Sequence, residues 1–198
     1  MLKWGKLEVA WGFPALLAAA MIAGAGEVLP LVAVAAVCHE LGHLGALRFF
    51  RVRVERMRLT GFGAEILADT RYLPYGRDLA CTLAGPAVNL ILALLLARVS
   101  GDYLLAGANL LQGAFNLLPL PQLDGGRALH LLLSWWVHPL AADRVCRWAA
   151  FGCAVMLLGT VLVLILRWGT GLFLLPAAMG GMLSAFGQLP IAKSVKTR

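Results

Sequence analysis

The sequence predicts an all-α polytopic membrane protein with about six transmembrane helices. Its 198 residues are 61% hydrophobic and only 14% charged, and the mean hydropathy is +0.82. An average soluble domain is about half apolar and about a quarter charged, and a chain this short cannot bury so much apolar surface in one water-facing globule. The composition therefore excludes an ordinary soluble enzyme, a disordered tail and a disulfide-stapled scaffold.

Apolar runs locate the helices, because a transmembrane helix needs about 20 mainly apolar residues. The third run contains Gly85-Pro86, and the fourth ends in a proline-rich stretch at 116–127. We expect the apolar segment 128–142 to continue this broken fourth helix. All spans are assigned to a single membrane-embedded domain, residues 1–198. The expected spans cover residues 9–26, 28–50, 79–97, 103–120, 148–166 and 169–187.

The net charge of +7 is interpreted as a topology signal, because cytoplasmic loops of membrane proteins carry an excess of Lys and Arg. With six spans and both termini cytoplasmic, 15 of the 17 basic residues fall on the cytoplasmic side, leaving Arg98 and Arg167 outside. The charges lie at the edges of apolar runs rather than along one face, so no nucleic-acid partner is expected. We expect a multi-pass protein of the cell membrane whose first span is retained, since no signal-peptide cleavage site is evident.

The segment 51–75 is the one sizeable polar insertion, and it is expected on the cytoplasmic side. Basic and β-branched residues mix from Arg51 to Leu59, and Gly61-Phe62-Gly63 follows. This pattern predicts a short pair of strands at the membrane surface, which could hold an extended substrate by pairing along a strand edge. The alternative is a basic loop that binds anionic lipid headgroups.

The second span contains the sequence His39-Glu40-Leu41-Gly42-His43. On a helix, residues i and i+4 share a face about 5–6 Å apart, so both imidazoles can reach one metal ion. Glu40 would sit beside that ion without ligating it, where it could accept a proton from water. An ionisable group in mid-span costs about 2.5–3.5 kcal/mol, so three within five residues indicate a functional site. A hydrogen-bonded histidine cluster that serves only helix packing is the alternative.

A catalytic zinc ion takes three protein ligands and a water. The candidates for the third ligand are His130, His138 and the ten acidic residues, most of which lie at span edges. Asp124 differs, because it lies in a stretch broken by two prolines and two glycines at membrane depth. Broken backbone is tolerated there only when it is buried in protein or lines a polar cavity. Asp124 is therefore favoured as a ligand; it could also, or instead, be the N-cap of the following helix.

Three stretches together resemble the site-2 protease family of intramembrane zinc metalloproteases: the 39–43 helix motif, the segment Ala84-Gly85-Pro86-Ala87-Val88-Asn89, and the break from Asn116 to Asp124-Gly125. The compact chain looks most like the branch that contains the stage IV sporulation protease, without a PDZ or CBS domain. The resemblance implies one Zn²⁺ per chain on His39, His43 and Asp124, with Glu40 as the general base. It also implies roles near the substrate for Asn89, which could help to stabilise the oxyanion, and for Asn116.

The leading hypothesis is thus a zinc-dependent intramembrane endopeptidase that acts in regulated proteolysis. Its partners would be a transmembrane or membrane-associated protein substrate, a membrane regulatory protein and the lipid bilayer. A metal-ion transporter is one alternative, because His and Asp within spans also mark ion pathways; a non-catalytic membrane-binding relative is another. Glu40 discriminates among them, because a transporter needs ligands but no adjacent general base.

Overall fold

The computed structural model describes residues 2–4, 7–9, 21, 26–60, 63–70 and 73–168. The chain divides into two compact units, Met1–Asn116 and Leu117–Arg198, and each is described by itself. The expected sixth span, 169–187, lies outside the described residues. So does the expected first span, 9–26, apart from residues 9, 21 and 26.

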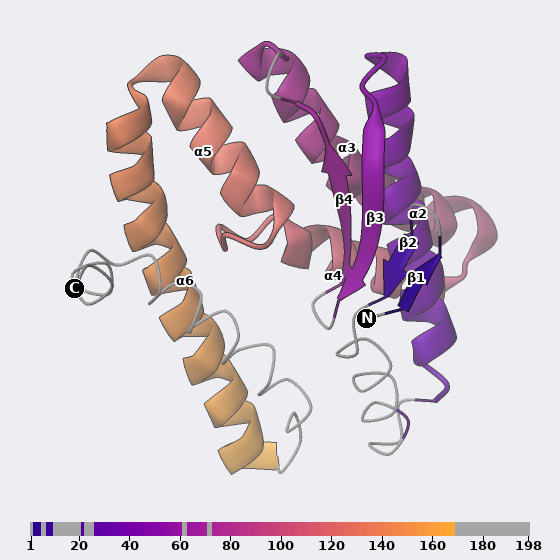
Figure 1. Ribbon diagram of the computed structural model, residues 1–198. Coiled ribbons are helices and arrows are strands. Elements are labelled where there is room, and N and C mark those ends of the chain that lie inside the picture. The colour runs from indigo at the N-terminus through magenta and orange to yellow at the C-terminus, as the bar shows by residue number, and fades with distance from the viewer. Residues whose placement is uncertain are drawn as a thin grey trace. The chain divides into compact units, whose positions relative to one another are not determined.

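Three helices form the body of the first unit: α2 (Leu29–Phe49), α3 (Tyr75–Leu95) and α4 (Tyr103–Asn116). A five-residue π-helical turn, η1 (Leu96–Ser100), extends α3. Each helix contacts the other two (Figure 1). The second and third expected spans are therefore helical, although α3 begins four residues before the expected start.

Small residues let α3 pass close to both of its neighbours. A Cβ atom on Gly42 of α2 would lie 2.7 Å from the Ala84 carbonyl oxygen of α3. A Cβ atom on Gly113 of α4 would lie 3.2 Å from the Asn89 Cβ of α3. Close backbone approach at glycine is a common way to pack helices inside a membrane. Here it lets Asn89 of α3 lie directly against α4.

The first unit also contains a four-stranded sheet with the order β1-β2-β3-β4. The prediction of a strand pair after the second span is confirmed by the antiparallel hairpin β3–β4, and β4 contacts α2, beside which the hairpin runs in Figure 1. The first two strands were not predicted; β2 pairs in parallel with β3, placing Leu7 opposite Met57. The strands are β1 (Leu2–Trp4), β2 (Leu7–Val9), β3 (Val54–Thr60) and β4 (Gly63–Ala68).

Glu8 gives the physical reason for these extra strands. Its side chain is buried, and its carboxylate accepts hydrogen bonds of 3.2 Å from the guanidinium groups of Arg56 and Arg58 on β3. This contact ties the N-terminal residues to a strand about 50 positions away. Val9, expected to begin a transmembrane helix, ends strand β2 instead, so the all-α prediction is corrected to a mostly helical fold with a small sheet.

The second unit is a helical hairpin of α5 (Asp124–Trp136) and α6 (Pro139–Trp168), preceded by the loop 117–123. Leu120 of the loop is buried against Ala150 and Ala154 of α6. A Cβ atom on Gly125 would collide with the Leu117 carbonyl group, so the loop can fold back over the start of α5 only because this residue is glycine.

Helix boundaries around the break differ from the predicted ones. Helix α4 ends at residue 116 rather than 120, α5 begins at 124 rather than 128, and α6 begins nine residues before the expected fifth span. The two glycines after Asp124 lie inside α5 rather than before it. Their missing side chains leave room for carbonyl groups of the preceding loop.

Within the described residues, three helices are long and apolar enough to cross a membrane: Leu29–Phe49, Tyr75–Ser100 and Pro139–Arg167. Many of their large apolar side chains are exposed, including Val37, Leu41 and Ile91, as expected for surfaces that face lipid. The chain is therefore a multi-pass membrane protein. The count of six spans is not confirmed, because α4 and α5 have only 14 and 13 residues and the outer two spans are not described.

Candidate metal centre

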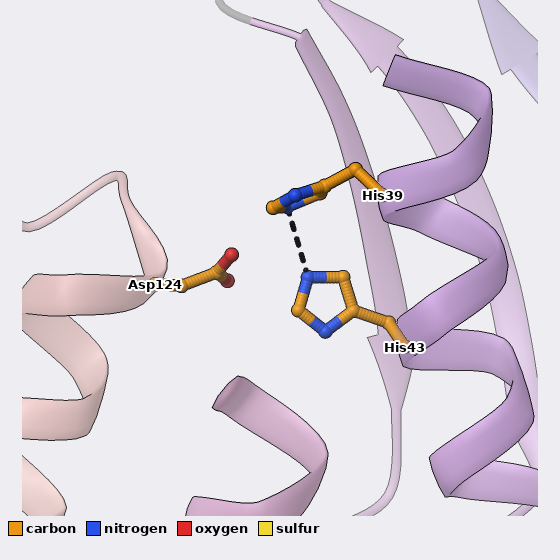
Figure 2. Close-up of side chains that lie close together, drawn as sticks. All are labelled: His39, His43 and Asp124. Carbon is orange, nitrogen blue, oxygen red and sulfur yellow. Dashed lines mark hydrogen bonds between the residues drawn. The ribbon is translucent and has the colours of Figure 1, made fainter. Parts of the chain in front are cut away.

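His39 and His43 lie one turn apart on the same face of α2. Their Nε2 atoms are 3.1 Å apart, and their ring centroids are 4.7 Å apart (Figure 2). His39 is buried, with 3% of its surface exposed, and His43 is partly buried. The helix thus holds the two imidazoles together inside an apolar segment.

The orientation of His39 is fixed from α3. Its Nδ1 atom lies 3.0 Å from Asn89 Oδ1. The Asn89 amide nitrogen donates hydrogen bonds to the Ala35 carbonyl oxygen at 3.0 Å and to Asn109 Oδ1 at 3.2 Å. Because this nitrogen uses both of its N–H groups, the Asn89 oxygen must accept and His39 Nδ1 must donate. When the ring carries a single proton, Nε2 is then its acceptor nitrogen.

The orientation of His43 is fixed by the backbone of α3. Its Nδ1 atom lies 2.9 Å from the Cys81 carbonyl oxygen, which can only accept, so Nδ1 donates and Nε2 is again the acceptor nitrogen. Gly85 makes room for the ring, since a Cβ atom there would collide with His43 Nε2 and lie 2.7 Å from Cε1. Within the Gly-Pro segment of α3, it is therefore the absence of a side chain at Gly85 that leaves space for the His43 ring.

The two imidazoles are suited by geometry and by charge to supply two of the ligands of a metal ion. Two acceptor nitrogens facing each other at 3.1 Å repel unless a proton or a cation lies between them. Zn–N bonds of 2.0–2.1 Å at a tetrahedral ion would separate two ligand nitrogens by about 3.3 Å. The observed separation fits that value, and the tautomers fixed by Asn89 and Cys81 are the ones that a metal ion requires.

Two carboxylates complete the set of predicted site residues. Glu40 is partly buried and follows His39 directly on α2. Asp124 belongs to the second unit, where it is partly buried as the first residue of α5; Leu123 occupies the N-cap position, so the N-cap alternative for Asp124 is wrong. A carboxylate in the first turn of a helix is favoured by the helix dipole. Figure 2 draws Asp124, whose carboxylate is a type of ligand that zinc binds together with histidine.

The remaining candidate residues have other contacts. Asn116 ends α4, and its amide nitrogen donates to the Gln112 carbonyl oxygen at 3.0 Å. His130 and Asp143 lie 2.9 Å apart and link α5 to α6. His138, in the turn between these helices, accepts a 3.3 Å hydrogen bond from the Leu140 N–H. The roles of Asn89 and Asn116 beside a substrate remain predictions, and Asn89 itself is fully buried.

Asn109 is the residue that sequence reasoning missed. It lies in the middle of α4, is 1% exposed, and bonds to Asn89. A signal was present, because a polar amide in the middle of an apolar span needs a partner. That the partner would be Asn89, on a different helix, was not visible in the sequence.

Comparison with known proteins supports the metal-centre interpretation. Residues 99–160 match the model of Peptidase family M50. A zinc metalloprotease of Methanocaldococcus jannaschii is 34% identical over 115 residues, which are 52% of this chain and 33% of that protein. Stage IV sporulation protein FB of Bacillus subtilis is 33% identical over 133 residues, 60% of this chain and 46% of that protein. The chain thus spans between a third and a half of the length of these relatives.

The fold has a solved counterpart as well. The structure of the site-2 protease from Methanocaldococcus jannaschii matches with a TM-score of 0.69 and 25% sequence identity. The match covers 95% of this chain and 93% of the other.

Proposed function

We propose that this chain, a relative of the site-2 proteases in peptidase family M50, is a zinc-dependent intramembrane endopeptidase. It would hydrolyse a peptide bond in or near a transmembrane segment of a membrane-protein substrate. The observation that carries the proposal is the His39–His43 pair, whose two acceptor nitrogens lie 3.1 Å apart inside an apolar helix.

The zinc ion, one per chain, would be held by His39, His43 and Asp124. When bound, it supplies a Lewis acid that polarises water and the scissile carbonyl group. Its two positive charges would balance the carboxylates of Glu40 and Asp124, so the loaded site would bury no net charge. The hydrogen-bond acceptors Asn89 Oδ1 and the Cys81 carbonyl oxygen, each of which faces a histidine Nδ1 atom, would keep the two histidines in the required tautomer.

Glu40 would be the general base. Its carboxylate would take a proton from the water that attacks the scissile carbonyl carbon, and would then give this proton to the leaving amine nitrogen as the C–N bond breaks. The position directly after His39 supports this assignment, because it places Glu40 beside the metal ligands on the same turn of α2.

We place both termini on the cytoplasmic side of the cell membrane. Arg48, in the last turn of α2, is nine residues beyond His39 and five beyond His43. At 1.5 Å per residue, the ligands would lie about 8–14 Å below the cytoplasmic surface. Cleavage would then fall in the cytoplasmic half of the substrate's transmembrane segment.

A helical substrate must unwind before its peptide bonds can react, and the sheet would hold the unwound segment. β3 is flanked by β2 and β4, so the strand edge near α2 belongs to β4. Neighbouring residues of an antiparallel strand direct their N–H groups alternately to the two sides. Of the variants Ile66→Pro and Leu67→Pro, one therefore removes an N–H group that points outward to the edge of β4, and the other removes one that points inward to β3. The outward variant should lower cleavage and leave the hairpin intact. Full cleavage by both variants would argue against strand pairing.

The test of the proposed function compares the membrane proteomes of cells that carry the native chain, Glu40→Gln or Glu55→Gln. Glu55 is exposed on β3 and provides the matched control. Uncleaved substrates should accumulate only with Glu40→Gln, while the purified variant retains its zinc. Equal proteolysis by all three chains would contradict the proposal, and zinc flux in proteoliposomes would instead favour a transporter.

A further inference from the structure

We propose that Asn109 is a positioning residue that acts through Asn89 to fix which nitrogen of His39 faces the metal. The inference rests on the proposed function only in taking His39 as a zinc ligand. No motif of the sequence assigns a role to Asn109; the hydrogen bonds among α2, α3 and α4 assign it.

The two asparagines form a buried polar connection between helices. Asn89 is 0% exposed and Asn109 is 1% exposed. An amide buried without partners costs several kcal/mol in an apolar medium, and these two bond to each other with an N···O distance of 3.2 Å. Gly113, one turn beyond Asn109, permits this approach, because a Cβ atom there would lie 3.2 Å from the Asn89 Cβ.

The hydrogen bonds have one consistent direction. The Asn109 amide nitrogen donates to the Leu105 carbonyl oxygen at 2.9 Å, which leaves its oxygen to accept from Asn89. The Asn89 nitrogen therefore faces Asn109, and the Asn89 oxygen faces His39. His39 must then carry its proton on Nδ1, with Nε2 as the nitrogen that binds metal.

Asn109 matters because it opposes the flipped orientation of Asn89. A flipped Asn89 would offer an N–H group to His39, so Nδ1 would have to accept and the proton would move to Nε2, where it blocks metal binding. The flip would also turn the Asn89 oxygen toward two other oxygens, those of Ala35 and Asn109. Removing Asn109 removes one of these two penalties, so its effect should be smaller than that of removing Asn89.

The experiment measures the histidine tautomer and the zinc affinity on purified protein. Asn89→Leu and Asn109→Leu replace each amide with an apolar side chain of similar size, and Asn109→Ala serves as a smaller second variant. Thr82→Val is the matched control: Thr82 is buried on α3, and its hydroxyl has no hydrogen-bond partner among the described residues. Nitrogen-15 spectra of the metal-free, histidine-labelled protein report the tautomer, with the His39 signal identified by its loss in His39→Gln. Competition with a chelator reports zinc affinity.

We expect the wild type and Thr82→Val to show His39 protonated on Nδ1, and the Asn variants to show a growing Nε2–H fraction. Zinc affinity should fall about 10–100-fold in Asn89→Leu and roughly 3–10-fold in the Asn109 variants. The proposal is overturned if both Asn109 variants match Thr82→Val in tautomer and affinity. It is also overturned if neither yields folded metal-free protein, since Asn109 would then serve folding alone. Failure of the proposed function looks different: the wild type would bind zinc no better than His39→Gln, whatever the tautomer.

Discussion

Replacing Gly85 by alanine tests the packing of His43 against α3. The new Cβ atom would overlap His43 Nε2 and lie 2.7 Å from Cε1 and 2.8 Å from Cδ2, whereas ordinary contacts begin near 3.4 Å. Relief of the Cε1 and Cδ2 contacts alone requires the ring to move by about 0.6–0.7 Å, and the overlap at Nε2 requires a larger shift. Metal–ligand distances tolerate changes of only about 0.2 Å. The methyl group should therefore displace His43 from the position in which we propose that it binds zinc.

Gly85→Ala should lower both the stability of the protein and its affinity for zinc. Overpacking of a close contact costs about 1–3 kcal/mol of stability, and a misdirected ligand should lower zinc affinity at least as much as a lost supporting hydrogen bond does, about 10–100-fold. Gly45→Ala on α2 is the matched control, because a Cβ atom there would meet nothing within 4 Å; it should stabilise the helix by up to about 1 kcal/mol. Zinc competition and thermal unfolding in detergent measure both effects. If Gly85→Ala bound zinc as tightly as Gly45→Ala, the proposed packing of His43 would be refuted.

Three further predictions concern the metal, the loop and the sheet. Chelation of zinc should lower the thermal unfolding temperature of the detergent-solubilised protein, because Glu40 and Asp124 lose the charge that balances them; an unchanged melting curve after zinc loss would contradict this. Gly125→Ala should lower the free energy of unfolding by about 1–3 kcal/mol, because the new Cβ atom would collide with the Leu117 carbonyl group. Gly152→Ala is the control and should leave stability unchanged, because a Cβ atom there would meet nothing within 4 Å. Equal melting temperatures for the two variants would count against the described loop. Glu8→Gln should lower the free energy of unfolding by about 1–2 kcal/mol, less than the loss of a fully buried ion pair would, because Arg56 and Arg58 are partly exposed. It should also speed amide hydrogen exchange at residues 7–9. Unchanged exchange there would contradict the role given to Glu8.

Local signals in the sequence were sufficient for helices α2 and α3 and for the histidine pair, but not for the bounds of α4, α5 and α6. Apolar runs located α2 and α3 to within a few residues, and the mixed basic and β-branched pattern located the β3–β4 hairpin. The spacing of His39 and His43 requires only helical geometry, and one helix supplies it. Features that depend on neighbouring residues of one element are those that a periodic pattern can predict.

Contacts between distant segments were not predictable in the same way. The β2–β3 pairing depends on Glu8 meeting arginines about 50 residues away, and a three-residue strand has too few positions to show a period. The role of Gly85 depends on which side chain of α2 lies opposite, and that of Asn109 on which polar group of α3 lies opposite. A polar residue inside an apolar span indicates that some partner exists, but not which one.

We have proposed that a single zinc ion is held by His39, His43 and Asp124, beside a Glu40 that does not ligate it. Zinc K-edge X-ray absorption on the purified chain, combined with zinc content, tests this claim most directly. We expect two imidazole nitrogens and otherwise oxygen ligands, loss of zinc in His39→Ala and Asp124→Ala, and an unchanged imidazole count in Glu40→Gln. Full zinc content with unchanged coordination in Asp124→Ala, or fewer than two imidazoles in the native chain, would contradict it.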